Sequence, residues 1–159
     1  MKRVMTVVFL LAAFALMSFA ADKPNFSGEW TCDLTKSDFG PIPPPATMVR
    51  KVDHSDPKMT VAQTQTGGPQ GDGTVTSKYS TDGTETTNDM MGSPTKSTAK
   101  WDGNALMIST KADFQGNEIT INSKWSLSDD GKTLTDVWHI VSPQGEFDVT
   151  YVLNKKAAN

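Results

Sequence analysis

The sequence has a single cysteine, Cys32, among 159 residues. One thiol cannot form an internal disulfide, so the stability of the domain must come from strand pairing and packing. Cys32 alternates with Trp30 and Leu34 in a strand-like run. This alternation favours a buried core residue; a free thiol or one paired to another chain is the alternative.

Basic residues are in the minority, with 15 Lys and Arg against 18 Asp and Glu and a formal net charge of −3. The first twenty residues contain Lys2 and Arg3 but no acidic residue. Taking these two away leaves 13 basic residues against 18 acidic ones, a formal net charge of −5. A balance of this sign provides no basic patch for nucleic acid or an anionic membrane surface. We therefore predict no nucleic-acid partner.

The one long apolar run lies at the start of the chain, from Val7 to Met17. It is shorter than the roughly 20 residues that a membrane-spanning helix needs. Basic residues precede it, and Ser18-Phe19-Ala20 follows it as a small-residue cleavage site. We therefore predict a signal peptide over 1–20, a single domain over 21–159, a secreted or periplasmic location and no integral membrane anchor.

Catalytic motifs are also missing. The sequence contains no nucleophile elbow, phosphate loop or dinucleotide fingerprint. His54 and His139 lie on separate predicted strands without metal-ligand spacing, so we interpret both as solvated surface imidazoles. The pair Asp129-Asp130 lies in a predicted turn, where Asp stabilises the backbone. We predict neither enzymatic activity, cofactor nor metal site; a small enzyme acting inside a barrel is the least favoured alternative.

Turn signals recur along the chain at intervals of about a dozen residues. Asp-Gly is typical of tight two-residue hairpin turns, whereas the Gln-Gly pairs and the segment 90–94 suit wider connections. Every second connection of a meander lies at the same end, so we expect one end closed by tight turns and one open end. The pairs are Gln70-Gly71, Asp82-Gly83, Asp102-Gly103, Gln115-Gly116, Asp130-Gly131 and Gln144-Gly145.

The residues between these turns predict about ten strands and no helix. The last four strands alternate apolar and polar residues and form an apolar wall, whereas the third to sixth carry polar residues on both faces. A dry sandwich core does not tolerate such polar residues, so we predict an up-and-down antiparallel β-barrel with a water-containing lumen. For the predicted strands 47–53 and 95–101, the pattern does not decide which alternate residues face inward. The facing of Arg50 and Trp101 is therefore open. The predicted strands are 28–34, 47–53, 59–66, 74–80, 84–89, 95–101, 105–113, 118–127, 133–141 and 146–154.

The segment Phe26-Ser27-Gly28-Glu29-Trp30 resembles the Gly-x-Trp motif that opens the lipocalins and their calycin relatives. The chain is also similar to small secreted lipocalin-like proteins of bacteria, which share Asn-Phe-Ser-Gly-x-Trp, Lys-Ser-Asp-Phe-Gly and repeated Asp-Gly turns. This resemblance implies that Trp30 plugs the closed end of a barrel. The chain departs from the lipocalins in lacking a Thr-Asp-Tyr triplet and an arginine near the C-terminus to cover Trp30. About ten strands is closer to the fatty-acid-binding relatives.

Candidate binding residues lie on the strands and around the open rim. Arg50 is the only arginine of 21–159. If it faces inward, its guanidinium offers a fork for a carboxylate or phosphate; the alternative is an exposed Arg50. Tyr79 and Tyr151 can provide a hydroxyl inside the barrel or simply pack. Apolar loop residues at the rim suit a lipid-like ligand or cover the barrel mouth. The predicted ligand-binding residues are Arg50, Tyr79, Met90, Met91, Ile108, Phe114, Ile121, Trp138 and Tyr151.

Two functions from different classes follow. The leading hypothesis is an exported, non-enzymatic protein that binds a small, largely apolar molecule in the lumen. The alternative is a structural or interaction module with a filled lumen, whose rim loops, above all Pro43-Pro44-Pro45, contact another protein. The sequence identifies no protein partner.

Overall fold

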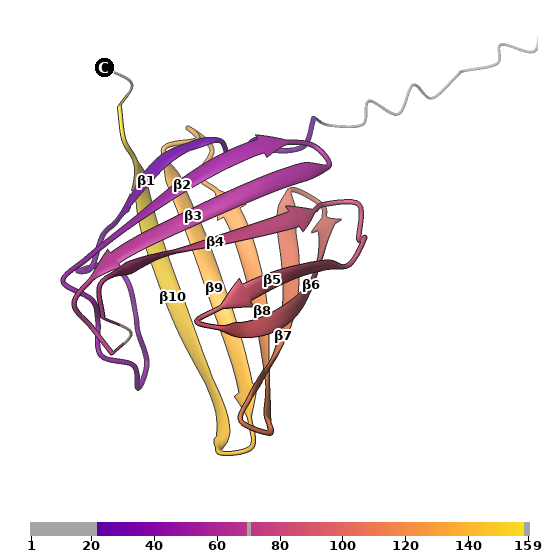
Figure 1. Ribbon diagram of the computed structural model, residues 1–159. Coiled ribbons are helices and arrows are strands. Elements are labelled where there is room, and N and C mark those ends of the chain that lie inside the picture. The colour runs from indigo at the N-terminus through magenta and orange to yellow at the C-terminus, as the bar shows by residue number, and fades with distance from the viewer. Residues whose placement is uncertain (1–21, 70, 158–159) are drawn as a thin grey trace, which may run out of the picture.

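The computed structural model describes residues 22–69 and 71–157, so the predicted signal peptide lies outside the described residues. Ten strands form one antiparallel sheet in the order β4-β3-β2-β1-β10-β9-β8-β7-β6-β5, which confirms the predicted all-β fold (Figure 1). The strands are β1 Gly28–Cys32, β2 Thr47–Ser55, β3 Lys58–Thr66, β4 Gly73–Ser80, β5 Thr86–Met90, β6 Ser93–Asp102, β7 Ala105–Phe114, β8 Asn117–Leu127, β9 Thr133–Ser142 and β10 Gly145–Lys155.

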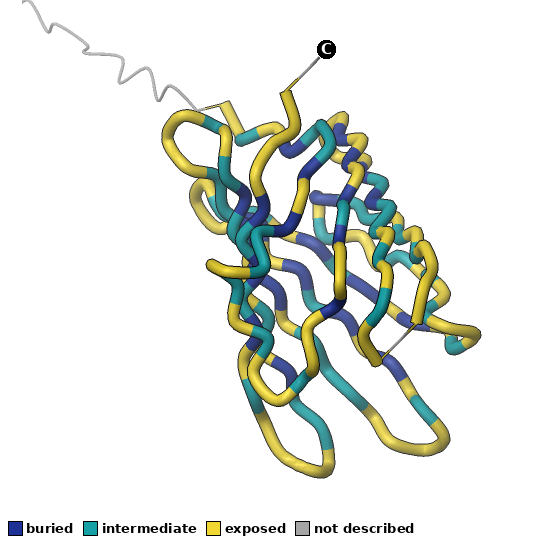
Figure 2. The backbone as a smooth tube through the Cα atoms, turned by 90° about the vertical axis from the view of Figure 1, so that its left-hand side faces the viewer, coloured by how far each residue is buried: buried dark blue, intermediate teal, exposed yellow. Residues whose placement is uncertain are grey.

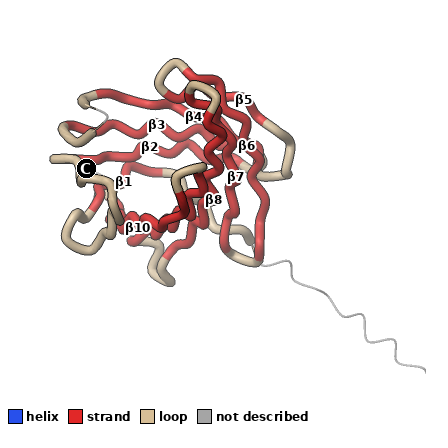
Figure 3. Tube along the Cα trace, turned by 90° about the horizontal axis from the view of Figure 1, so that it is seen from below, coloured by secondary structure: helices blue, strands red, loops and turns tan. Residues whose placement is uncertain are grey.

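The first and last strands lie side by side in the middle of the sheet. β1 pairs with β10, with Trp30 opposite Lys155, and β1 also pairs with β2. Seen from below, the strands follow one another round a ring (Figure 3). β4 and β5 are the edges of the sheet and have no backbone ladder between them. The Asn88 side chain spans this seam: its Oδ1 accepts from Lys78 N at 2.7 Å, and its Nδ2 donates to Lys78 O at 3.0 Å.

The predicted contrast between tight and wide connections is wrong in two places. At the closed end, Asp82-Gly83 lies in the connection 81–85 between β4 and β5, which do not pair, instead of in a tight hairpin. The other place is the rim. The predicted wide loop 90–94 is instead a two-residue turn, with φ of 56° at Met91 and 83° at Gly92. Gln115 and Gly116 repeat this pattern, with φ of 56° and 84°. Two consecutive residues of positive φ match the right-handed twist of a hairpin, which accounts for both turns. The wide connections at this end are β1–β2 and β3–β4 alone among the described residues.

Aromatic residues fill the closed end. Phe26 and Trp30 are fully buried, and Trp30 Nε1 donates to Phe26 O at 2.9 Å. Lys155 Nζ lies 5.2 Å from the Trp30 ring centroid, so a lysine covers this tryptophan where the lipocalin pattern has an arginine. Cys32 is buried beside Ser37, with Sγ 3.4 Å from Oγ, as its alternation predicts.

The interpretation of His54 as a surface residue is wrong. β2 continues to Ser55, and its alternation places His54 on the inner face. The ring is buried, stacks on Phe26 with centroids 5.8 Å apart, and its Nδ1 accepts from Phe26 N at 3.2 Å. Trp101 also faces inward and stacks on Phe26. His139 is exposed and its Nδ1 lies 2.7 Å from Asp148, as expected of a surface imidazole.

Along the last four strands, buried residues alternate with more exposed ones (Figure 2). The buried residues include Leu106, Trp125 and Leu134, which belong to one core cluster. The predicted apolar wall is therefore confirmed. Polar residues of β6 also face inward and find partners there, since Ser97 Oγ lies 2.8 Å from Thr110 Oγ1. Among the described residues no buried side-chain polar atom lacks a hydrogen-bond partner. Across the same residues no helix has the length and apolar character needed to span a membrane.

Candidate ligand-binding site

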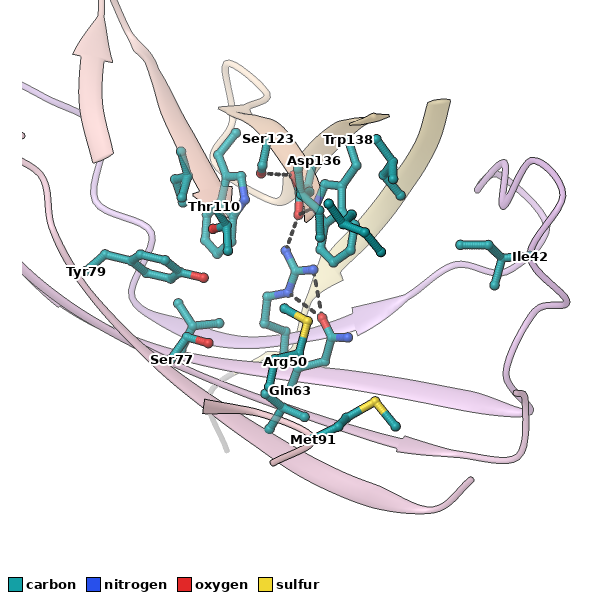
Figure 4. Close-up of a pocket in the computed structure, with 18 of the residues that line it drawn as sticks. Ile42, Arg50, Gln63, Ser77, Tyr79, Met91, Thr110, Ser123, Asp136 and Trp138 are labelled. Atoms are coloured by element: carbon teal, nitrogen blue, oxygen red, sulfur yellow. Dashed lines mark hydrogen bonds and ion pairs between the residues drawn. The ribbon is translucent and has the colours of Figure 1, made fainter. Parts of the chain in front are cut away.

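A cavity of about 290 Å³ lies inside the barrel and reaches the rim (Figure 4). Its volume is close to the lower end of the roughly 300–1,000 Å³ range of small-molecule pockets. β7 to β10 contribute mainly apolar side chains to its wall, whereas β3 and β4 contribute several polar ones. Eight of the nine predicted residues line it: Arg50, Tyr79, Met90, Met91, Ile108, Phe114, Ile121 and Trp138.

Arg50 faces the lumen and is 1% exposed, which decides the parity of β2. Its Nη1 donates to Asp136 Oδ2 at 2.8 Å. Its Nε and Nη2 both donate to Gln63 Oε1, at 3.2 and 2.8 Å. Gln63 is the residue opposite Arg50 in the β2–β3 ladder, so the register of the sheet places the two together. The predicted fork is thus present but already engaged by the protein.

Asp136 is the residue of this site that the sequence analysis missed. It is fully buried on β9, and its carboxylate accepts three hydrogen bonds. Besides the bond from Arg50, Trp138 Nε1 donates to Oδ2 at 2.7 Å and Ser123 Oγ donates to Oδ1 at 2.5 Å. The available signal was the alternation of β9, since Asp136 stands between Leu134 and Trp138, both predicted to face inward.

Two aromatic rings flank the guanidinium. Its Cζ lies 4.8 Å from the Trp125 ring centroid and 5.7 Å from that of Tyr151. Both distances fall within the range of cation–π attraction. The two rings, together with the acceptors Asp136 and Gln63, hold Arg50 in one position, and such preorganisation lowers the cost of binding a ligand.

The two tyrosines have different roles. The Tyr79 hydroxyl points into the lumen, and burial raises the pKa of Tyr79, partly offset by a hydrogen bond with Ser77. Tyr151 does not line the cavity. Its ring packs edge-on against Trp138 and Phe39, with centroids 5.0 and 5.7 Å apart, and burial raises the pKa of Tyr151 to about 12. Tyr151 therefore belongs to the packed core beside the cavity.

The rim is apolar and comes from separate connections. Ile42 belongs to the long β1–β2 connection, Met90 and Met91 to the β5–β6 hairpin, and Phe114 and Phe147 to the hairpins beyond. Met91 is 59% exposed, the highest value among the exposed large hydrophobic residues described. A flexible, exposed Met beside a cavity mouth suits contact with an apolar molecule that passes it.

No family model matches the sequence, and no curated protein matches it. Among solved structures, zebrafish ileal bile acid-binding protein complexed with cholic acid is similar, with a TM-score of 0.59, 18% identity, and 82% of this chain and 98% of that chain covered. The fatty acid binding protein of Schistosoma mansoni in complex with arachidonic acid has a TM-score of 0.53 and 12% identity, covering 83% and 96%.

A secretory abundant heat soluble protein from Ramazzottius varieornatus is similar too, with a TM-score of 0.60, 12% identity, and coverage of 82% and 94%. At these identities the shared property is the fold. The chain therefore adopts the nearly closed, ten-stranded antiparallel barrel of fatty-acid-binding and lipocalin-like proteins. This confirms the fold that the Gly-x-Trp resemblance implies, while the bacterial and secreted character of the resemblance stays a prediction.

The site combines apolar and polar groups in one cavity. An apolar wall faces a fixed polar network, the arrangement typical of pockets that orient an amphipathic ligand. Within the described ranges no group of three or more His, Cys, Asp or Glu side chains could hold a metal ion.

Proposed function

We propose that this protein binds a small, largely apolar molecule in the lumen of its barrel and that the molecule enters at the apolar rim. The observation that carries the proposal is the cavity of about 290 Å³, which has both an apolar wall and a buried polar network. A barrel built only for stability gains from close packing, since an apolar void of this size destabilises a core.

The structural comparisons support the same class of ligand. Two proteins of this fold were solved with amphipathic molecules, cholic acid and arachidonic acid. Both compounds combine a large apolar part with polar groups. The lumen described here offers the matching division between the Ile121 side of the wall and the Arg50 side.

The direct test is native mass spectrometry of the purified protein, followed by organic extraction of any mass that dissociates. We expect a reproducible small-molecule adduct, or one that forms on incubation with a lipid extract. A protein that stays free of adducts in both experiments, and also fails to bind a fluorescent apolar probe such as Nile red, would contradict the proposal.

A matched pair of variants locates the binding site. Ile121→Trp places a bulky ring in the cavity, and we expect it to abolish uptake of Nile red while circular dichroism stays that of a β-barrel. Asn122→Trp adds the same ring to the exposed face of β8, one residue away, and should bind the probe normally. Equal binding by both variants would place the ligand outside the lumen.

We also propose that the protein is exported and that residues 1–20 are its signal peptide, as their three-part pattern supports. The measurement is the intact mass of the protein recovered from the periplasm or medium. Retention of the first twenty residues in the recovered protein would contradict this.

A further inference from the structure

The lumen contains one positive and one negative charge. Among the described residues that line the cavity, Arg50 and Asp136 are the only charged ones. They form an ion pair at 2.8 Å, and their side chains are 2% and 1% exposed. The charge of Arg50 is therefore already neutralised by the protein, and the cavity as a whole is electrically neutral.

Hydrogen-bonding capacity remains at this pair even though its charge is satisfied. A guanidinium has five N–H groups. Those of Arg50 donate one bond to Asp136 and two to Gln63. Two N–H groups are left for the acceptor atom of a ligand. The Tyr79 hydroxyl adds a second hydrogen-bonding group in the same lumen, and it is neutral near pH 7 as tyrosine ordinarily is.

A ligand carboxylate fits this arrangement poorly. It would place a second negative charge beside Asp136, with a single buried cation to serve both. Burying a charge without its own partner is far more costly than burying a hydrogen-bonded neutral group. A hydroxyl or carboxamide can accept from the Arg50 N–H groups at no such cost.

We propose, resting on the function proposed above, that the lumen selects apolar molecules whose polar end is uncharged, such as an alcohol or a primary amide, over the corresponding carboxylates. Asp136 determines this specificity, because it neutralises the one cation that would otherwise attract an acid. The apolar remainder of the ligand lies along the wall formed by Ile108, Ile121 and Ile140.

The test compares three ligands that share one chain and differ only in the head group. Isothermal titration calorimetry near neutral pH measures the binding of decanol, decanamide and decanoate to the purified protein. We expect decanol and decanamide to bind at least about tenfold more tightly than decanoate. Decanoate binding as tightly as decanol would overturn the inference and leave the proposed function standing. If none of the three binds, the inference falls, whereas the proposed function falls only if adducts and Nile red binding are absent as well.

Removing the negative charge should reverse the preference. Asp136→Asn leaves the Arg50 charge unpaired, and we expect decanoate to gain at least about tenfold in affinity relative to decanol. Asp129→Asn is the matched control, because it removes the same charge from an exposed closed-end turn. An unchanged ranking in Asp136→Asn would overturn the role of Asp136.

A second variant keeps the test decisive if Asp136→Asn fails to fold. Arg50→Gln/Asp136→Asn removes both charges and keeps the lumen neutral, so the preference for decanol over decanoate should persist. A strong preference of this double variant for decanoate would contradict the inference, because no cation would remain to explain it.

Discussion

The guanidinium of Arg50 and the carboxylate of Asp136 meet at 2.8 Å although 86 residues separate them in the chain. They project from β2 and β9, which are not neighbours in the sheet. Each is almost completely buried. This ion pair therefore joins two separate parts of the barrel wall across its interior.

Breaking one side of the pair should cost more stability than removing both. Arg50→Met leaves Asp136 as a buried, uncompensated charge, and Asp136→Leu does the same to Arg50. We expect each single variant to lose about 3–5 kcal/mol, and the double variant to lose clearly less than their sum. Urea unfolding followed by tryptophan fluorescence measures all three. Additive losses would show that the two side chains contribute independently.

The strands could be predicted from the sequence because their signals are local. Apolar alternation and recurring Gly pairs each act within a few residues, and together they locate all ten strands. The details that failed depend on neighbours distant in sequence. Nothing near His54 shows that its ring stacks on Phe26 of the preceding segment. The segment 90–94 and the alternation of turn classes favour a wide connection, yet the chain turns tightly at Met91-Gly92, and β6 accommodates Pro94 next to its first residue.

The candidate site could be predicted in part, where its residues follow a local alternation. Alternation placed Ile108, Ile121 and Trp138 on the inner face correctly. The same alternation places Asp136 on the inner face. A carboxylate is not expected in an apolar wall unless a partner for its charge is known. That partner is Arg50, whose own facing the sequence left open. The two side chains meet only because the sheet curves into a barrel and both face its interior.

The tyrosines predict how stability depends on alkaline pH. The chain contains only Tyr79 and Tyr151, and burial raises the pKa of both, that of Tyr151 to about 12. Below the ordinary pKa of about 10, the tyrosine hydroxyls are neutral in both the folded and the unfolded protein. Between about 10 and 12 the unfolded chain loses protons that the folded protein keeps, so stability falls as pH rises.

Spectrophotometric titration of tyrosinate absorbance checks this directly. We expect little tyrosinate in the folded protein until the pH exceeds the ordinary value, with its appearance coupled to the loss of the circular dichroism signal. Tyr151→Phe should shift the alkaline unfolding midpoint upward. Titration of both tyrosines near pH 10 in a protein that remains folded would contradict the burial that the structure shows.

Gly28 should resist replacement because of its backbone and its neighbour. Its φ is +138°, and a Cβ at this position would lie 2.9 Å from Lys155 Cε, the side chain that covers Trp30. We expect Gly28→Ala to lower the free energy of unfolding by about 1–3 kcal/mol. Gly145→Ala is the matched control, since φ there is +133° and nothing lies within 4 Å of the added Cβ.

The steric part of this effect can be separated from the backbone part. In a Lys155→Ala background, Gly28→Ala should cost less than in the wild type, and its cost should approach that of Gly145→Ala. Chemical denaturation of the four variants measures these differences. An identical cost of Gly28→Ala with and without Lys155 would assign the whole effect to the backbone.

The Asn88 side chain should control the opening of the barrel between β4 and β5. It replaces the missing ladder by bonding both Lys78 N and Lys78 O. Because a typical hydrogen bond contributes a net ~0.5–1.5 kcal/mol, we expect Asn88→Ala to speed amide exchange at Lys78 on the order of tenfold. Asn122→Ala is the control. The Asn122 side chain is also hydrogen-bonded, but it lies on β8, which pairs with both β7 and β9.

Asn88→Asp distinguishes the two bonds of this seam. A carboxylate keeps the acceptor for Lys78 N but loses the donor to Lys78 O, so exchange at Lys78 should stay close to the wild-type rate while the seam loosens. If the seam is also a route for the ligand, Nile red should dissociate faster from Asn88→Ala than from Asn122→Ala. Equal dissociation rates, together with faster exchange at Lys78, would show that the ligand leaves only through the rim formed by Ile42, Met91 and Phe114.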